Sequence, residues 1–163
     1  MPSPLESLRQ TLPQIGRLVW IGLRPTRGAP MQAVTDAFVT LEGGLEGDRF
    51  AGRPGSRRQI TLFQAEHLAV VSALLGKPIE PQLLRRNLVV EGINLLALKD
   101  QCFRIGDVVL EGTGPCAPCS KMEVALGPGG FNALRGHGGL CARVRSAGAI
   151  HLGDAVSLQT NTR

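Results

Sequence analysis

Short stretches of alternating apolar and polar residues recur along the chain and predict a mainly β structure. Residues 15–23 are rich in Val, Ile and Trp, and residues 32–41 alternate between apolar and polar positions, so both predict strands. The same features predict further strands at residues 58–62, 88–90, 121–126 and 140–144. Roughly seven or eight short strands are typical of a closed or partly closed barrel, because closure removes exposed sheet edges.

A Gly-Asp pair marks a turn in two of the apolar segments. Gly106-Asp107 lies within residues 103–111 and Gly153-Asp154 lies within residues 150–159, with alternating residues after each pair. Because Gly and Asp favour tight turns, each segment predicts a β-hairpin.

Helical spacing is clear in one segment only. Apolar residues recur three or four positions apart over residues 63–75, and Gly76 ends the pattern. Residues 81–85 predict a short helical turn, and residues 129–134 predict a short helix. The predicted fold class is therefore mainly β, a β-rich α+β barrel with one or two short helices.

The length of 163 residues fits one domain. We expect residues 1–14 to form a leader and residues 15–160 to form the single domain, since no linker divides the chain. Residues 42–56 are rich in glycine and predict a long loop, a feature that is often functional in a compact domain.

The charge balance points to a small anionic ligand. The net charge is +5, and nearly all of the basic residues are arginine, whose planar guanidinium suits phosphate and carboxylate. Codon preference and a solvated surface explain the same composition equally well. The basic residues form no long block and the chain has no Tyr, so we expect no nucleic-acid surface built on base stacking.

The N-terminal residues predict a cytoplasmic protein. Residues 1–14 contain prolines and acids instead of a basic start followed by an apolar run, so they do not resemble a secretory signal. The apolar stretches are too short to cross a bilayer, and we expect no membrane association. In a reducing compartment the four cysteines would be catalytic, metal-binding or buried.

A pair of cysteines is the sharpest chemical feature of the sequence. Cys116 and Cys119 lie in a loop rich in Gly and Pro, which reads GTGPCAPCSK over residues 112–121. Such a loop exposes its side chains and restricts their freedom. Lys121 is two residues from Cys119, and a nearby cation favours the thiolate, the form that acts as nucleophile and metal ligand.

Several interpretations of the pair remain open on spacing alone. A redox pair of the thioredoxin type would open a helix, whereas a strand is predicted here from residue 121. A structural zinc site could combine Cys116, Cys119, His137 and Cys141. A single thiolate could ligate a soft metal or carry sulfur. Finally, both cysteines could be buried and inert.

Several short motifs in a fixed order resemble the MOSC family, named for the C-terminal domain of molybdenum-cofactor sulfurase. The resemblance runs through roughly residues 15–158. Its motifs are GLEGDR at 44–49, RQITL at 58–62, RRNLVVEG at 85–92, FRIGD at 103–107, PCAPC at 115–119 and Gly153-Asp154 before the closing strand.

The resemblance implies a β-barrel and a site for a molybdenum–molybdopterin cofactor. Cys119 matches the family's cysteine, as the second of the pair and the one before the next strand, which implies that it is the catalytic residue and molybdenum ligand. Arg85 and Asn87 are implied to hold the pterin phosphate. Further candidates for cofactor binding are Arg57, Arg58, Lys121 and Cys116.

The function implied is that of a molybdenum-cofactor oxidoreductase that takes part in reducing N-hydroxylated compounds, with a small-molecule substrate and an electron-transfer partner. One alternative is a sulfur (persulfide) carrier or cofactor-transfer domain, with a sulfur donor or acceptor protein as partner. A second alternative is a zinc-stapled binding module. Pyridoxal phosphate is not expected, because the sulfurase domain that binds it has no counterpart here and no lysine has a suitable setting.

Overall fold

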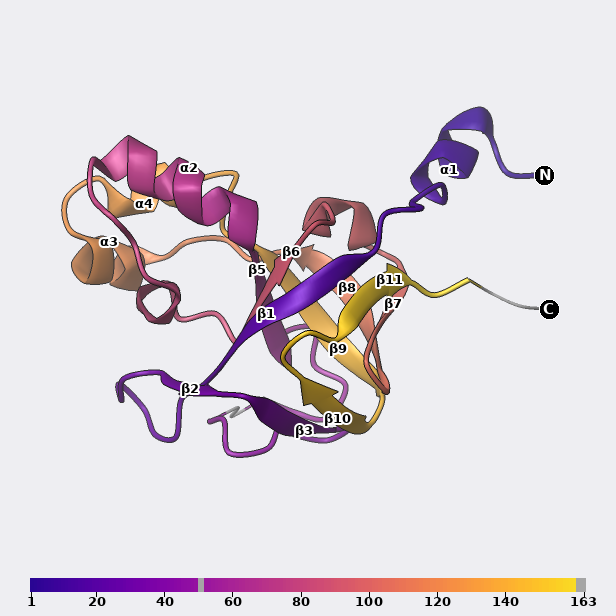
Figure 1. Ribbon diagram of the computed structural model, residues 1–163, viewed down its shortest axis with the longest axis horizontal. Coiled ribbons are helices and arrows are strands. Elements are labelled where there is room, and N and C mark those ends of the chain that lie inside the picture. Colours follow the sequence, from indigo (N-terminus) through magenta and orange to yellow (C-terminus); the bar gives the residue numbers. More distant parts are fainter. Residues whose placement is uncertain (50–51, 161–163) are drawn as a thin grey trace.

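A computed structural model describes residues 1–49 and 52–160 and shows a barrel of strands with three of its helices gathered on one side (Figure 1). The strands are β1 (Gly16–Leu23), β2 (Gln32–Val34), β3 (Asp36–Thr40), β4 (Gly44–Leu45), β5 (Ile60–Gln64), β6 (Leu88–Glu91), β7 (Cys102–Ile105), β8 (Val108–Pro115), β9 (Leu140–Ser146), β10 (Gly148–His151) and β11 (Ala155–Leu158). The helices are α1 (Pro4–Arg9), α2 (Ala65–Leu75), α3 (Ser120–Leu126) and α4 (Gly130–Leu134), with 3-10 turns η1 (Pro81–Leu84) and η2 (Leu95–Leu98). The predicted mainly β class is confirmed.

The barrel closes because β1 pairs with the last strand. The strand order is β11-β7-β8-β9-β5-β6-β1, and β11 pairs again with β1 to complete a ring of seven strands. Gly16 at the start of β1 lies opposite Val156, and Ile21 near its end lies opposite Val34 of β2. A small separate sheet, β10-β3-β4, lies beside the barrel.

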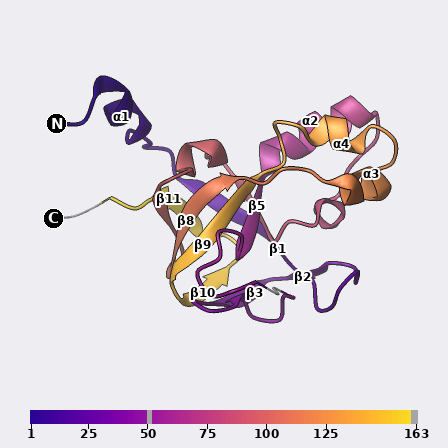
Figure 2. The same cartoon turned by 180° about the vertical axis from the view of Figure 1, so that it is seen from behind.

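Two apolar clusters fill the molecule. One occupies the barrel interior, and a second lies between the barrel wall and helices α2, α3 and α4 (Figure 2). Neighbouring residues of β5 serve both clusters, since Leu62 belongs to the first and Phe63 to the second. Strand β5 is parallel to β6, and α2 lies in the connection between them, as a parallel pair requires a crossover. Residues 60–63 of β5 are all buried, because both faces of this strand are covered.

Most predicted elements are confirmed. The strands expected at 15–23, 58–62, 88–90 and 140–144 are present, and residues 32–41 form two strands, β2 and β3. The hairpin expected at 103–111 is β7 and β8. The helix expected at 63–75, the turn at 81–85 and the short helix at 129–134 are α2, η1 and α4.

The strand predicted at residues 121–126 is wrong, because these residues form helix α3. Met122, Val124 and Leu126 would share one face of a strand, which is why the segment resembles one. In the helix only Met122 and Leu126 share a buried face, and Val124 is 86% exposed. The alternation was too short to distinguish the two periods.

The hairpin predicted at residues 150–159 is also wrong. Strand β10 pairs with β3, whereas β11 pairs with β1 and β7, so the Gly153-Asp154 turn carries the chain from one sheet to the other. A local turn signal does not specify the partner of the strand that follows it.

The remaining segments contain little regular structure. Of the glycine-rich segment 42–56, residues 50 and 51 lie outside the described residues, and the rest contains only the short strand β4. Residues 1–14 contain helix α1, which is capped by Ser3 and Glu6 and buries none of its residues. Among the described residues no helix has the length and apolar character needed to span a membrane.

We predict that Gly139→Ala destabilises the protein far more than Gly76→Ala. Both glycines have positive φ, 100° and 70°, which strains an L-residue. A Cβ at Gly139 would lie 2.0 Å from the Leu62 carbonyl oxygen, whereas a Cβ at Gly76 meets nothing within 4 Å. Chemical denaturation should show a loss of about 1 kcal/mol for Gly76→Ala and at least about 3 kcal/mol for Gly139→Ala. Equal losses would contradict the close packing of residue 139 on β5.

Candidate functional site

One cavity gathers positive charge around a cysteine. Its volume is about 190 Å³, and Cys119, Thr26, Gly28 and Met122 form part of its wall. The rest of its described wall is cationic and is made by Arg24, Arg27, Arg49, Arg58, Arg85, Arg86 and Lys121. No aspartate or glutamate is among the described wall residues of this arginine cavity. Such an excess of one charge favours an anionic ligand.

Cys119 lies where the loop after β8 enters α3. It is the N-cap residue of that helix, and its carbonyl oxygen accepts from the Met122 amide at 2.9 Å. Its side chain makes no capping hydrogen bond. Of the four free cysteines it alone is exposed. The thiol is therefore free to react or to bind a metal from the cavity.

The two cysteines of the pair face different cavities. Helix α3 follows Cys119, where a strand was predicted. The predicted strand was the argument against a thioredoxin-type pair, and that argument is wrong. However, Cys116 is 1% exposed and lines another pocket, whereas Cys119 lines the arginine cavity. We therefore treat Cys119 alone as the thiol of the arginine cavity.

Arg86 fixes the loop that carries Cys119. Its side chain is buried, and Nε donates to the Gly138 carbonyl oxygen at 2.8 Å. Its terminal nitrogens donate to the carbonyl oxygens of Leu84, Cys116 and Ala117 at 3.3–3.5 Å. Among the described residues no carboxylate lies within ion-pair distance of it. Burial lowers the pKa of Arg86, and the nearby Cys116 opposes this shift.

Arg85 reaches the arginine cavity through an unusual backbone conformation. It has φ of 56°, in the left-handed region, directly after η1, and its side chain donates to the Ala29 carbonyl oxygen at 3.2 Å. Burial and the neighbouring Arg24 lower the pKa of Arg85, while Asp48 opposes the shift. Asp48 is already paired with Arg24 at 3.6 Å, so the cluster keeps an excess of positive charge.

Asn87 is not part of the cavity wall. It is 1% exposed, and its Oδ1 accepts from the Thr61 amide at 3.1 Å and lies 3.2 Å from the Thr61 hydroxyl. Its Nδ2 donates to the Gly22 carbonyl oxygen at 3.3 Å. The contacts of Asn87 join β5, β6 and β1, so the structure gives it a part in holding the barrel instead of a contact with a phosphate.

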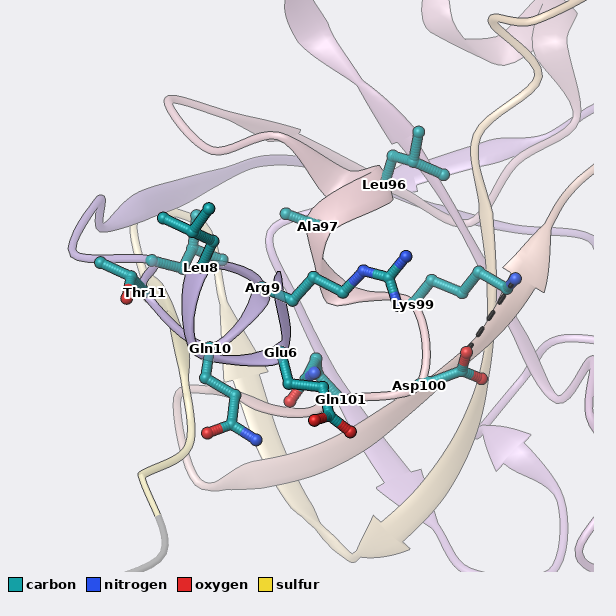
Figure 3. A pocket seen from close by; sticks show the side chains of 11 residues that line it. Glu6, Leu8, Arg9, Gln10, Thr11, Leu96, Ala97, Lys99, Asp100 and Gln101 are labelled. Carbon is teal, nitrogen blue, oxygen red and sulfur yellow. Dashed lines mark ion pairs between the residues drawn. The ribbon is translucent and has the colours of Figure 1, made fainter. Parts of the chain in front are cut away.

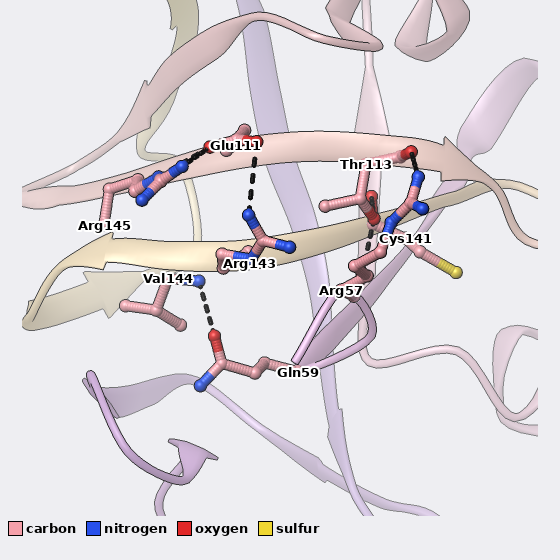
Figure 4. A network of polar contacts seen from close by, with 8 residues as sticks. All are labelled: Arg57, Gln59, Glu111, Thr113, Cys141, Arg143, Val144 and Arg145. Atoms are coloured by element: carbon pink, nitrogen blue, oxygen red, sulfur yellow. Dashed lines mark hydrogen bonds and ion pairs between the residues drawn. The ribbon is translucent and has the colours of Figure 1, made fainter. Parts of the chain in front are cut away.

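Arg57 does not line the arginine cavity and instead contacts Thr113 near the end of β8 (Figure 4). Its guanidinium donates to the Thr113 carbonyl oxygen at 2.9 Å, and the Thr113 hydroxyl contacts the carbonyl oxygens of Arg57 and Cys141. Arg57 lines a separate shallow cavity together with Arg58. Of the predicted cofactor residues, the structure therefore brings Arg58, Arg85 and Lys121 to Cys119, but not Arg57, Asn87 or Cys116.

Cys116 and Cys141 form a buried thiol pair beside Arg86. A hydrogen bond from Cys141, together with the positive charges of Arg86 and Arg58, lowers the pKa of Cys116 to about 6 despite burial. The same hydrogen bond and burial raise the pKa of Cys141. The lowered pKa favours the thiolate form of Cys116 beside Arg86, which has no carboxylate partner among the described residues.

The zinc interpretation is not supported. It required Cys116, Cys119, His137 and Cys141 to converge. Within residues 1–49 and 52–160, no group of three or more His, Cys, Asp or Glu side chains is placed to hold a metal ion. The structure instead leaves Cys119 among arginines, separate from the buried pair.

Two larger cavities lack the cationic lining. One, of about 590 Å³, lies between helix α1 and the turn after η2, and its wall mixes Glu6 and Asp100 with Arg9 and Lys99 (Figure 3). It contains no cysteine or histidine among its described lining residues. The other, of about 690 Å³, lies beside Cys116 and contains two histidines, His67 and His137.

Four cavity arginines were not predicted from the sequence. They are Arg24, Arg27, Arg49 and Arg86. Arg86 was within reach of sequence reasoning, since it lies in the quoted RRNLVVEG motif next to Arg85. The other three lie in loops whose meeting with Cys119 depends on the closed barrel.

The chain is thus a small closed β-barrel domain with an exposed thiol in an arginine-lined cavity. The chain belongs to the MOSC domain family, whose model matches residues 47–157. No curated protein matches the sequence.

Solved structures share the fold. The YuaD protein from Bacillus subtilis has a TM-score of 0.77 at 18% identity, covering 93% of this chain and 100% of that one. YiiM from Geobacillus stearothermophilus has a TM-score of 0.73 at 20% identity, covering 89% and 75%. YiiM from Escherichia coli has a TM-score of 0.69 at 19% identity, covering 90% and 71%.

We predict that Asn87→Ala destabilises the protein by about 1–3 kcal/mol, because it leaves the Thr61 amide and the Gly22 carbonyl without a buried partner. Asn132→Ala, at an exposed position of α4, should change stability by less than about 0.5 kcal/mol. Chemical denaturation measures both. If Asn87→Ala kept wild-type stability but lost binding of pyrophosphate, the predicted phosphate contact would stand and the barrel role would be wrong.

Cys116 should make stability depend on pH. Its pKa is about 6 when folded against an ordinary value of 9.0, so between these values the unfolded chain binds more protons. Stability should therefore rise with pH across this window and be lost as pH falls through about 6. Denaturation at a series of pH values should show this slope in the wild type and in Cys102→Ser, and a flatter slope in Cys116→Ser. An unchanged slope in Cys116→Ser would contradict the assigned thiolate.

Proposed function

We propose that this MOSC chain binds a molybdenum–molybdopterin cofactor in the arginine cavity, with Cys119 as the metal ligand. The observation that carries the proposal is the position of the one exposed thiol in a cavity with seven cationic wall residues and no described acid. The family membership supports it, because MOSC domains are named for the enzyme that sulfurates this cofactor.

The donor set fits such a group. A thiolate is a soft ligand of the kind that suits molybdenum, and Cys119 is free to provide one. A guanidinium can hold a phosphate with two parallel, charge-assisted hydrogen bonds, and Arg85 and Arg58 both lie in the wall. Lys121 would add a point charge from the first turn of α3.

The reaction we propose is the reduction of an N-hydroxylated compound. The hydroxylamine group takes up two electrons and two protons, the N–O bond breaks, and the products are the amine and water. A separate redox protein would supply the electrons. When bound, the cofactor would supply two-electron, oxygen-accepting chemistry, while this chain orients the cofactor through its arginines and ligates it through Cys119.

A second candidate is a sulfur carrier, in which Cys119 bears a persulfide for a donor or acceptor protein. The exposure of Cys119 favours it, since a partner's thiol can reach the sulfur atom. Both candidates require reduced thiols, so we place the protein in the cytoplasm.

Elemental analysis tests the proposal. Wild-type protein from a host that makes the cofactor should contain nearly one molybdenum per chain, with the pterin detected by fluorescence after release. Cys119→Ala should lose the metal, because its ligand is gone, while Cys102→Ser should retain it. Arg85→Gln should lower cofactor retention on the order of tenfold, whereas Arg104→Gln, an exposed site on β7 with the same charge change, should not.

Two outcomes would contradict the first candidate. Wild-type protein without molybdenum would exclude the cofactor role. If that protein instead released sulfur on treatment with a thiol, and Cys119→Ser did not, the carrier role would hold. Retention of molybdenum in Cys119→Ala would show that another group is the ligand.

A further inference from the structure

The arginine cavity is small compared with sites that enclose a whole organic ligand. Its volume is about 190 Å³, below the range of about 300–1,000 Å³ that is typical of such sites. The cavity therefore takes either a small ion or one end of a larger molecule. Seven of its 11 described wall residues are Arg or Lys and none is Asp or Glu, so a small oxyanion with more than one negative charge is favoured.

Much of this positive charge is not used by the protein itself. Arg24 pairs with Asp48 at 3.6 Å, but Arg58, Arg85 and Lys121 form no ion pair with any described residue. Arg85 gives one donor to a backbone carbonyl oxygen at 3.2 Å, and a guanidinium has five. A bound dianion would thus meet charges and donors that remain available to it.

Cys119 adds a nucleophile to the same cavity. It lines the wall, it is exposed, and its side chain makes no capping hydrogen bond. Burial lowers the pKa of Arg86, and Cys119 is one of three cysteines that oppose this shift, so its sulfur lies within electrostatic range of the guanidinium. A thiolate and an anion repel each other, and a cationic wall offsets that repulsion. The cavity therefore suits a thiolate that attacks an anionic substrate.

We propose that the arginine cavity binds a small oxyanion with a terminal sulfur atom, of which thiosulfate is the simplest, and that this ion is the sulfur donor to Cys119. The thiolate attacks the terminal sulfur and forms a new S–S bond. The S–S bond of thiosulfate breaks, and sulfite leaves with the electron pair. The product is a persulfide on Cys119, and the step needs no oxidant or reductant.

This inference rests on the carrier candidate for the function of Cys119, and it adds the chemical class of the donor. Sulfate and phosphate resemble thiosulfate in charge and shape but have no terminal sulfur. They should therefore occupy the cavity without reacting and should compete with thiosulfate. A neutral sulfur compound would gain nothing from the cationic wall.

The test uses the full chain from a host that does not make molybdopterin, so that the cavity is open. After reduction and addition of thiosulfate, mass spectrometry should show the gain of one sulfur atom in the wild type and in Cys102→Ser, but not in Cys119→Ser. Sulfite should appear in equal amount, and cyanide should remove the added sulfur as thiocyanate. Sulfate should slow the loading, and this slowing should be overcome by more thiosulfate.

Arginine variants test whether the cavity holds the donor. Arg85→Gln should lower the second-order rate constant for loading by thiosulfate on the order of tenfold, whereas Arg104→Gln, at an exposed site on β7, should not. Each rate constant is divided by that for the neutral disulfide dithiodipyridine, which reports only the reactivity and access of the thiol. This ratio should fall in Arg85→Gln, because only thiosulfate needs the positive charge.

A persulfide made without thiosulfate separates the donor from the carrier role. Sulfide displaces thiopyridine from Cys119 after reaction with dithiodipyridine and leaves a persulfide. If Cys119 holds this persulfide but thiosulfate loads none, the donor is wrong and the carrier candidate stands. If neither route gives a persulfide, both fail. Equal loading in Cys119→Ser, no competition by sulfate, or an unchanged ratio in Arg85→Gln would also overturn the proposal. Molybdenum content tests the cofactor candidate separately.

Discussion

The geometry around Cys119 depends on a buried guanidinium that has no carboxylate partner. Arg86 spans the turn after η1, the cysteine loop and the glycine loop at residues 136–139, and its donors meet carbonyl oxygens from each of them. A buried charge of this kind is costly unless it is compensated, and the positive charge of Arg86 in turn lowers the pKa of the neighbouring Cys116, which favours its thiolate form. Arg86 therefore affects both the position of the loop at residues 115–119 and the ionisation of the Cys116 thiol. Both cavities that border this loop depend on the contacts of Arg86.

Periodicity predicted most of the fold because one face of most strands packs on the barrel interior. It failed at α3, where three apolar residues two positions apart fitted a strand and a helix equally well. It also failed at β10 and β11, because strand pairing across the barrel is a non-local property. The turn at Gly153-Asp154 was read correctly as a turn, but its neighbours pair with β3, β1 and β7.

The candidate site was only partly predictable. Cys119, Arg58, Arg85 and Lys121 were recognised from local sequence and do converge. Asn87 lies in the same motif as Arg85, yet it is buried just before β6, where Thr61 and Gly22 bind it, whereas Arg85 has a left-handed backbone directly after η1. Residue type could not reveal this difference in direction. Arg24, Arg27 and Arg49 reach the cavity from loops near β1 and β4, which sequence distance conceals.

The pairing of β1 with β11 has a consequence for how the chain folds during synthesis. Gly16 leaves the ribosome long before its partner Val156, because the two residues lie far apart in the sequence. Until then the nascent chain presents unpaired strand edges, which invite association with other chains. A fold with many contacts between residues far apart in the sequence also folds slowly, because bringing distant segments together costs conformational entropy before their contacts can form. We therefore expect chaperone engagement during translation to be greatest just before β11 emerges.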